Sequence, residues 1–253
     1  MSPTDENDHA LAARAATDVG RLLVRIRASW NGGEGRALGD RGDAAAHAAL
    51  VELLAAARPE DTVLSEEGDD EGGRLESERV WIVDPLDGTR EFGEAGRVDW
   101  AVHVALVVRG EPIVGAVALP ALDTTLGTAS PPPSPPPGAG RVRVVVSRTR
   151  PPAAAERVAE ALDADLVPLG SAGAKAMAVV QGEADAYVHA GGQYEWDSAA
   201  PVAVARAAGL HASRLDGSPL RYNSPRPWLP DLLVCRPDLA PAIVAAAAAY
   251  PEG

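Results

Sequence analysis

The feature that most limits the fold of this chain is a short apolar run that ends in two aspartates. Residues 80–83 form a continuous apolar stretch, which is typical of a buried strand, and the hexapeptide Asp-Pro-Leu-Asp-Gly-Thr follows at 84–89. Two carboxylates on either side of a proline-fixed turn can point at one cation and leave the carbonyl of Leu86 free to bind it as well. The glycine and threonine then open a turn whose N–H groups can face a phosphate. Taken alone, the same pattern is also compatible with an ordinary β-turn.

Further acidic residues stand where predicted strands end or helices begin. Glu66 follows a short strand at 62–65, Asp197 precedes a helix at 198–208, and Asp43 precedes an alanine-rich helix at 44–50, of which we expect it to be the N-cap. Carboxylates gathered at such edges repel each other unless a cation joins them. Ligands that are all oxygen suit Mg²⁺, Mn²⁺ or Ca²⁺.

Hydrophobic periodicity predicts the remaining elements. In the first half we expect a helix at 8–28, a Gly-rich turn at 31–42, and a hairpin from strands at 102–108 and 113–119. In the second half strands alternate with helices: strands at 142–146, 184–188 and 232–235, and helices at 152–162, 172–180, 198–208 and 239–249. The first half is therefore predicted to be α+β and the second α/β.

A proline-rich segment separates these halves. Six prolines and two serines fill 130–137, so we expect an N-terminal half at 1–128, a connector at 129–140 and a C-terminal half at 141–253. The segment could instead be a polyproline ligand for a partner protein, but a solvated connector is the simpler interpretation.

Charge and cysteine content exclude several classes of function. The chain has 23 basic and 36 acidic residues, a net charge of -13, so it has no general attraction to nucleic acid or anionic membranes. Cys235 is the only cysteine, which leaves no internal disulfide and no thiolate zinc site. We find neither the apolar core of a signal peptide in residues 1–20 nor an apolar run long enough to span a bilayer. We therefore expect a cytoplasmic protein.

Three segments resemble signatures of one family of metal phosphatases. The run from Trp81 to Phe92, the Trp-Asp-x-Ala-Ala pattern at 196–200 and the Glu-Glu pair at 66–67 resemble the inositol monophosphatase-like, lithium-sensitive phosphatases in order and spacing along nearly the whole chain. The resemblance implies a layered α-β-α-β-α sandwich of the sugar-phosphatase type. It also implies a site completed by both halves, two or three Mg²⁺ ions with Mn²⁺ as a substitute, a small anionic phosphate substrate, and a homodimer.

Other segments are similar to one branch of that family, the 3′(2′),5′-bisphosphate nucleotidases of sulfate assimilation. They are Thr-Arg-Glu-Phe at 89–92, Val-Ser-Arg at 146–148, Gly-Ser-Ala-Gly-Ala-Lys at 170–175 and Pro-Leu-Arg-Tyr-Asn at 219–223. The chain departs from the branch at Thr149-Arg150, where Ser-His is common, and at Tyr194 before Glu195. This implies a phosphoric monoester hydrolase acting on adenosine 3′,5′-bisphosphate. Inositol monophosphate and fructose 1,6-bisphosphate are the alternative substrates, and a catalytically inactive sensor is a rival of another class.

The resemblance also implies roles for single residues. Glu66, Asp84, the Leu86 carbonyl, Asp87 and Asp197 would hold the metal ions. Thr89, aligned by Asp43, would position the attacking water and take up its proton. The residues expected to contact substrate are Glu66, Leu86, Asp87, Gly88, Thr89, Arg148, Ser171, Lys175, Glu195 and Asp197.

Some of these residues have equally simple structural interpretations. Lys175 could contact phosphate or ribose, or be a solvated charge on its helix. Glu195 could touch the sugar or cap the helix of Asp197, and Glu67 could support the site or face solvent. Arg148, at a strand end, is the candidate for a second phosphate. The histidines at 47, 103, 189 and 211 lack metal-like spacing, so we expect them to be structural or at the surface, and we expect Trp81 and Trp196 to serve packing.

Overall fold

A computed structural model describes residues 6–68, 73–136, 138 and 140–248. Its first sheet has five strands in the order β1-β2-β3-β4-β5. β1 runs parallel to β2, and the other neighbours are antiparallel. The strands are β1 (Thr62–Ser65), β2 (Arg79–Asp87), β3 (Ala101–Val108), β4 (Glu111–Leu119) and β5 (Thr124–Gly127).

The second sheet also has five strands, in the order β7-β6-β8-β10-β9. β6 pairs in parallel with β7 and β8, while β10 is antiparallel to β8 and β9. These strands are β6 (Arg143–Ser147), β7 (Asp165–Leu169), β8 (Ala186–Tyr194), β9 (His211–Ser213) and β10 (Trp228–Cys235).

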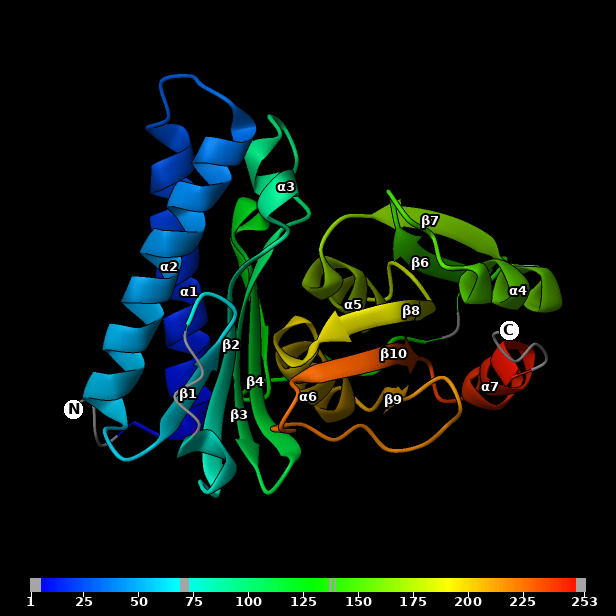
Figure 1. Ribbon diagram of the computed structural model, residues 1–253. Coiled ribbons are helices and arrows are strands. Elements are labelled where there is room, and N and C mark those ends of the chain that lie inside the picture. The colour runs from blue at the N-terminus through cyan, green and yellow to red at the C-terminus, as the bar shows by residue number, and fades with distance from the viewer. Residues whose placement is uncertain (1–5, 69–72, 137, 139, 249–253) are drawn as a thin grey trace.

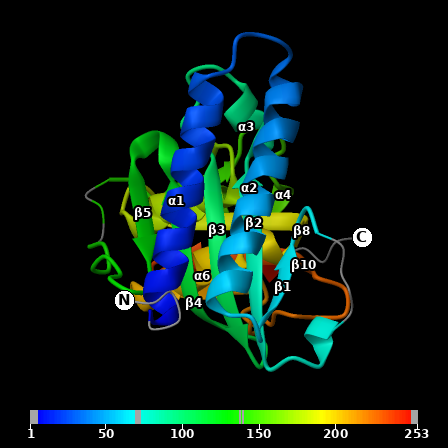
Figure 2. The same ribbon diagram turned by 90° about the vertical axis from the view of Figure 1, so that its left-hand side faces the viewer.

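Helices form three layers around the two sheets (Figures 1 and 2). α1 (Asp8–Ala28) and α2 (Gly35–Ala57) cover the outer face of the first sheet, and α5 (Ala172–Val180) and α6 (Ala199–Ala207) lie between the sheets. α4 (Ala153–Leu162) and α7 (Ala240–Ala248) cover the outer face of the second. This arrangement confirms the predicted α-β-α-β-α sandwich. The short helices are α3 (Thr89–Gly93), η2 (Gly73–Leu75), η3 (Pro120–Leu122) and η4 (Glu195–Asp197).

Three buried clusters of apolar side chains fill the spaces between these layers. The side chains of β2 alternate between two of these clusters, and this alternation sets the direction of Asp84. Trp81 and Val83 face α1 and α2, whereas Val80 and Ile82 belong to the cluster around α5 and α6. Successive side chains of a strand point to opposite faces, so Asp84 follows Ile82 onto the face that looks at the middle helices. The strand thus carries a carboxylate into the centre of the molecule.

Most predicted elements are confirmed to within a few residues. The short strands β5, β7 and β9 were not predicted, and β8 and β10 are longer than expected. Within the described residues, no helix is both long and apolar enough to cross a membrane. Residues 137 and 139 of the predicted connector, residue 249 of the last predicted helix and the first five residues lie outside the described ones.

The predicted turn at 31–42 and the predicted cap at Asp43 are wrong. α2 begins at Gly35, so Asp43 lies in the interior of the helix. The glycines that suggested a turn allow close packing against α3 instead. A Cβ on Gly39 would lie 2.5 Å from the Thr89 methyl, and one on Gly42 would lie 2.8 Å from the ring of Phe92. The glycine face of α2 therefore brings Asp43 next to the start of α3.

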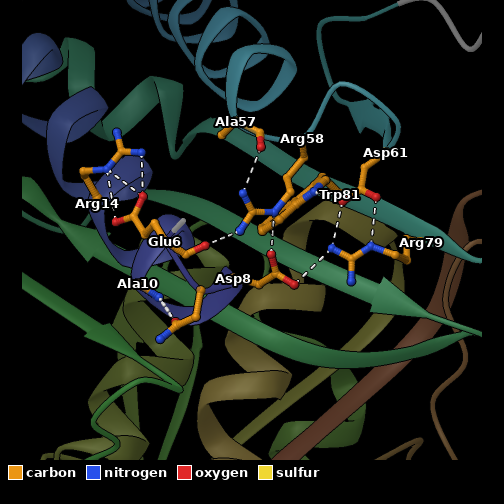
Figure 3. Close-up of polar contacts among 10 residues, drawn as sticks. Glu6, Asp8, Ala10, Arg14, Ala57, Arg58, Asp61, Arg79 and Trp81 are labelled. Carbon is orange, nitrogen blue, oxygen red and sulfur yellow. Dashed lines mark hydrogen bonds and ion pairs between the residues drawn. The ribbon is translucent and has the colours of Figure 1, made fainter. Parts of the chain in front are cut away.

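A polar network fixes the start of α1 to the first sheet (Figure 3). Arg58 Nε donates to Asp8 Oδ1 at 2.7 Å, and Arg79 joins Asp8 to Asp61 at 3.0 and 2.8 Å. The indole N–H of Trp81 donates to Asp61 at 2.8 Å. This network confirms a packing role for Trp81, which is fully buried.

Candidate active site

Three aspartates from the two halves of the sequence meet between the sheets. Asp84 and Asp87 lie in the last part of β2, and Asp197 is the last residue of η4, just before α6. One carboxylate oxygen of each lies within 4.8 Å of the others. Asp84 and Asp87 are buried, and Asp197 is half-buried. The structure therefore brings together three of the five residues predicted to bind metal.

Several donors hold the carboxylate of Asp87. The N–H of Ala172 donates to Oδ1 at 3.1 Å and that of Gly173 to Oδ2 at 2.6 Å, both from the first turn of α5. The ring of His103 lies 3.1 Å from Oδ2. Burial alone would raise the pKa of Asp87, but the positive charge of His103 and these hydrogen bonds lower it below its ordinary value. Asp87 is therefore the anionic anchor of the cluster.

The other carboxylates are held together against their mutual repulsion. Burial and the charge of Asp87 raise the pKa of Asp84 well above its ordinary value and that of Asp197 to about 6. Glu66 follows β1 directly and is exposed, and it is not among the three carboxylates that converge. Partial loss of hydration around the Glu66 carboxylate, together with the negative charge of Asp197, raises the pKa of Glu66 to about 7. Such carboxylates release their protons readily when a cation is present.

The donor set fits a hard divalent cation. The cluster offers carboxylate oxygens from three residues, and the Leu86 carbonyl lies in the same turn, 3.2 Å from the Thr89 hydroxyl. The N–H of Leu86 also donates to Asp84 Oδ1 at 3.1 Å, which fixes the turn. Oxygen-only sites of this kind prefer Mg²⁺, Mn²⁺ or Ca²⁺ over softer metals.

A threonine and an aspartate form a second pair beside the cluster. The hydroxyl of Thr89 lies 3.1 Å from Asp43 Oδ2, to which it donates. Asp43 is 8% exposed, and its Oδ1 has no hydrogen-bond partner among the described residues. Burial raises the pKa of Asp43 to about 7, despite the opposing hydrogen bond from Thr89. A carboxylate of this kind can accept a proton near neutral pH.

Gly88 joins the aspartates to α3 through a left-handed turn. Its φ is 87°, which favours glycine, and a Cβ here would lie 2.9 Å from the Cβ of Ser171. The turn starts α3 at Thr89, so the Thr89 hydroxyl stands next to the acidic cluster. The contact with Ser171 places the start of α5 against the same turn.

Ser171 and Lys175 lie on α5, at the side of the cluster. Ser171 is the N-cap and accepts the N–H of Ala174 at 2.9 Å. Lys175 is 4% exposed, its Nζ donates to the Gly170 carbonyl, and it lies 5.3 Å from the centre of the Tyr187 ring. Burial lowers the pKa of Lys175, against the attraction of Asp87 and Glu91. The interpretation of Lys175 as a solvated charge is therefore wrong, and its contact with substrate stays a prediction.

Arg148 has carboxylate partners in the structure. Its Nε donates to Glu91 and its Nη2 to Glu94, each at 2.6 Å. Both glutamates belong to α3 or follow it directly, so Arg148 bridges the second sheet to the turn that carries Thr89. Its predicted contact with a second phosphate would require this bridge to rearrange, and that contact stays a prediction.

Glu195 holds a neighbouring segment in place. It is fully buried, and its two oxygens accept the N–H groups of Asn223 and Ser224 at 2.6 and 3.0 Å. Of its two interpretations, the capping role is wrong, because it is Asp197 that accepts the N–H of Tyr194 at 2.7 Å. The contact of Glu195 with a sugar stays a prediction. Glu67 is exposed, as one of its two interpretations expects.

His103, which we expected to be structural or at the surface, lies beside the acidic cluster. It is fully buried, and its Nδ1 lies 3.0 Å from the carbonyl of Trp196 while its Nε2 faces Asp87. Burial lowers the pKa of His103, but the charge of Asp87 outweighs it and the net pKa is raised. No spacing motif could have placed it there, because the pairing of β2 with β3 sets it opposite Asp84.

Comparison with known proteins finds a matching family model, similar curated proteins and similar solved structures. The family model described as "Inositol monophosphatase family" matches residues 3–132 and 137–252. A Mycobacterium tuberculosis protein named "3'-phosphoadenosine 5'-phosphate phosphatase" is 53% identical over 91% of this chain and 90% of its own length. The Escherichia coli "3'(2'),5'-bisphosphate nucleotidase CysQ" is 34% identical over 72% of this chain and 78% of its own. The crystal structure of CysQ from Bacteroides thetaiotaomicron superimposes with a TM-score of 0.77 at 26% identity, covering 89% of this chain and 96% of that one.

Proposed function

Because this chain belongs to the inositol monophosphatase family, we propose that it is a metal-dependent phosphatase that removes the 3′-phosphate of adenosine 3′,5′-bisphosphate. The observation that carries this function is the 53% identity, over nine tenths of both chains, to a relative named for that activity. The nucleotidase name of the more distant Escherichia coli relative supports the same class of reaction. The products would be AMP and inorganic phosphate.

We assign the metal site to Glu66, Asp84, the carbonyl of Leu86, Asp87 and Asp197. Mg²⁺ is the ion that we propose, because every donor is oxygen and three carboxylates already converge. When bound, such ions supply a water of lowered pKa and neutralise charge on the leaving oxygen.

The protein's own groups would handle the proton of the attacking water. The Thr89 hydroxyl donates to Asp43, so its oxygen can accept a proton from water as its own proton passes to the Asp43 carboxylate. The pKa of about 7 suits Asp43 to this exchange near neutral pH. The N–H groups at the start of α3 would steady the transferred phosphoryl group.

A substrate panel tests the proposed reaction. Phosphate release is measured with Mg²⁺ and with EDTA for adenosine 3′,5′-bisphosphate, inositol 1-phosphate and fructose 1,6-bisphosphate, and the substrates are compared by kcat/KM. We expect adenosine bisphosphate to rank first and EDTA to stop turnover. A higher kcat/KM for inositol 1-phosphate would move the chain to the alternative activity, which the comparisons support only at the level of the family.

Arg148 tests recognition of the second phosphate. We expect Arg148→Ala to lower kcat/KM for adenosine bisphosphate by about tenfold, mainly through KM, because a charge-assisted contact is lost in ground and transition states alike. Turnover of inositol 1-phosphate should change little. The matched control is Arg141→Ala, which removes an exposed arginine paired with Asp163. Equal losses on both substrates would mean that Arg148 acts through its bridge to Glu91.

A further inference from the structure

A single buried side chain touches two segments that carry predicted metal ligands. The ring of His103 reaches Asp87 at the end of β2 with Nε2, at 3.1 Å. Its Nδ1 lies 3.0 Å from the carbonyl of Trp196, the residue before Asp197. His103 is 0% exposed, so water cannot replace either contact.

The two partners of the His103 ring are the carbonyl of Trp196 and the carboxylate of Asp87. The carbonyl oxygen of Trp196 needs a donor, so Nδ1 carries a proton in this arrangement, and Nε2 faces the Asp87 carboxylate at 3.1 Å. The start of α5 is shaped around the ring as well. A Cβ on Gly173 would lie 2.1 Å from His103 Nε2, so only glycine lets the helix approach this closely.

The contacts of Asp87 then decide which of its two carboxylate oxygens remains free to bind a cation. Oδ2 accepts the N–H of Gly173 and lies 3.1 Å from His103 Nε2, so protein atoms enclose this oxygen. Within the part of the chain that the structure describes, Oδ1 accepts the N–H of Ala172 and keeps one lone pair for a cation. A carboxylate held in this way presents one defined oxygen to a cation.

We propose that His103 is a positioning residue of the metal site, which orients Asp87 so that Oδ1 is its ligand oxygen. The proposal rests on the proposed function only in taking Asp87 as a metal ligand. Groups that hold a ligand carboxylate commonly change metal affinity by about 10- to 100-fold when they are removed. His103 acts through Asp87 and touches neither substrate nor the reacting atoms.

Two isosteric amides separate the two contacts of the ring. Asn at 103 places its amide N–H near the position of Nδ1 and can keep the contact with the Trp196 carbonyl. Gln places its amide N–H near the position of Nε2 and can keep the contact with Asp87. A role in packing alone would not favour Gln over Asn.

The test is calorimetric titration of the substrate-free protein with Mn²⁺ and Mg²⁺ at fixed pH. We expect His103→Asn to weaken binding by about 10- to 100-fold and His103→Gln to stay within about threefold of wild type. The control is His211→Asn, a half-buried histidine that contacts Ser213 at the edge of the second sheet, and it should bind like wild type. Melting in EDTA shows whether each variant is folded.

Three results would overturn the proposal. The first is wild-type metal affinity in His103→Asn, and the second is an equal loss of metal affinity in the Asn and Gln variants when both are folded. The third is tighter metal binding in either variant, because the ring would then be a competing cation. If His103→Asn does not fold, the Gln variant decides alone, because a tenfold loss there contradicts the proposal. The titration needs no substrate, so a chain that shows this pattern but does not hydrolyse adenosine bisphosphate would refute only the proposed function.

Discussion

Neutralising Asp197 should stabilise the metal-free protein while it removes activity. In the folded chain, burial and the charge of Asp87 raise the pKa of Asp197 from 3.8 to about 6. Each pH unit of difference between folded and unfolded pKa is worth about 1.4 kcal/mol, so the ionised carboxylate costs the fold about 3 kcal/mol above pH 6. Asn keeps an acceptor for the N–H of Tyr194, so Asp197→Asn removes the charge with little change of shape.

The sign of the pH dependence follows from the raised pKa. Between pH 3.8 and about 6 the folded state binds more protons than the unfolded state, so the stability of wild type falls as pH rises through this window. The advantage of Asp197→Asn should therefore be about 3 kcal/mol at pH 8 and about 1.6 kcal/mol at pH 5. For a chain of this length that corresponds to a melting temperature about 5–10 °C above wild type at pH 8 in EDTA.

The assay is thermal or urea unfolding in EDTA at pH 8 and pH 5, repeated with Mg²⁺. Binding to the folded state alone stabilises wild type by about 2.7 kcal/mol at a hundredfold excess over Kd, and the variant should gain much less. Its turnover of adenosine bisphosphate should be nearly absent. Asp18→Asn, an exposed carboxylate on α1, is the control and should stay within about 0.5 kcal/mol of wild type. If Asp197→Asn is less stable than wild type in EDTA at pH 8, the electrostatic reasoning is wrong.

Three further perturbations have defined outcomes. Thr89→Ala should lower kcat by about a hundredfold with little change in KM or circular dichroism, because Asp43 loses its link to the attacking water; a wild-type kcat would exclude Thr89 from proton transfer. Millimolar Li⁺ should inhibit turnover, with Na⁺ as the ionic-strength control, as the family resemblance implies. Hydrogen bonds and charge from Arg143, joined by Arg236, outweigh burial and lower the pKa of Asp185. This stability is fully present above pH 3.8 and is lost as pH falls through the lowered folded pKa, so Asp185→Asn should cost about 2 kcal/mol in urea unfolding at pH 7 and progressively less below pH 3.8; a cost that stays the same down to about pH 2 would contradict this.

Local sequence signals were sufficient to predict the helices whose first-turn N–H groups are capped by a neighbouring side chain. α1 and α5 have the predicted bounds because each combines helical spacing with a side chain that caps its first turn, Asn7 and Ser171. The site motif at 84–89 was also readable, since both aspartates and the turn after them lie within one short segment. Short strands such as β9 carry too few residues to show a period.

Features that depend on contacts between distant residues could not be read in this way. The glycines of α2 resemble a turn until α3 is packed against them. His103 and Asp84 are opposite each other only through the register of β2 and β3. The bridge from Arg148 to Glu91 joins residues 57 positions apart, and no periodicity reports such a pair.

The glycine face of α2 also limits how this protein can be engineered. Replacing helical glycines by alanine is a common route to higher thermal stability, because alanine restricts the unfolded chain and favours the helix. At Gly39 the added methyl would meet the side chain of Thr89 at 2.5 Å, and at Gly35 it would meet the carbonyl of Gly93 at 2.6 Å. A stabilisation programme guided by helix propensity would therefore select the very substitutions that push Asp43 away from the Thr89 hydroxyl.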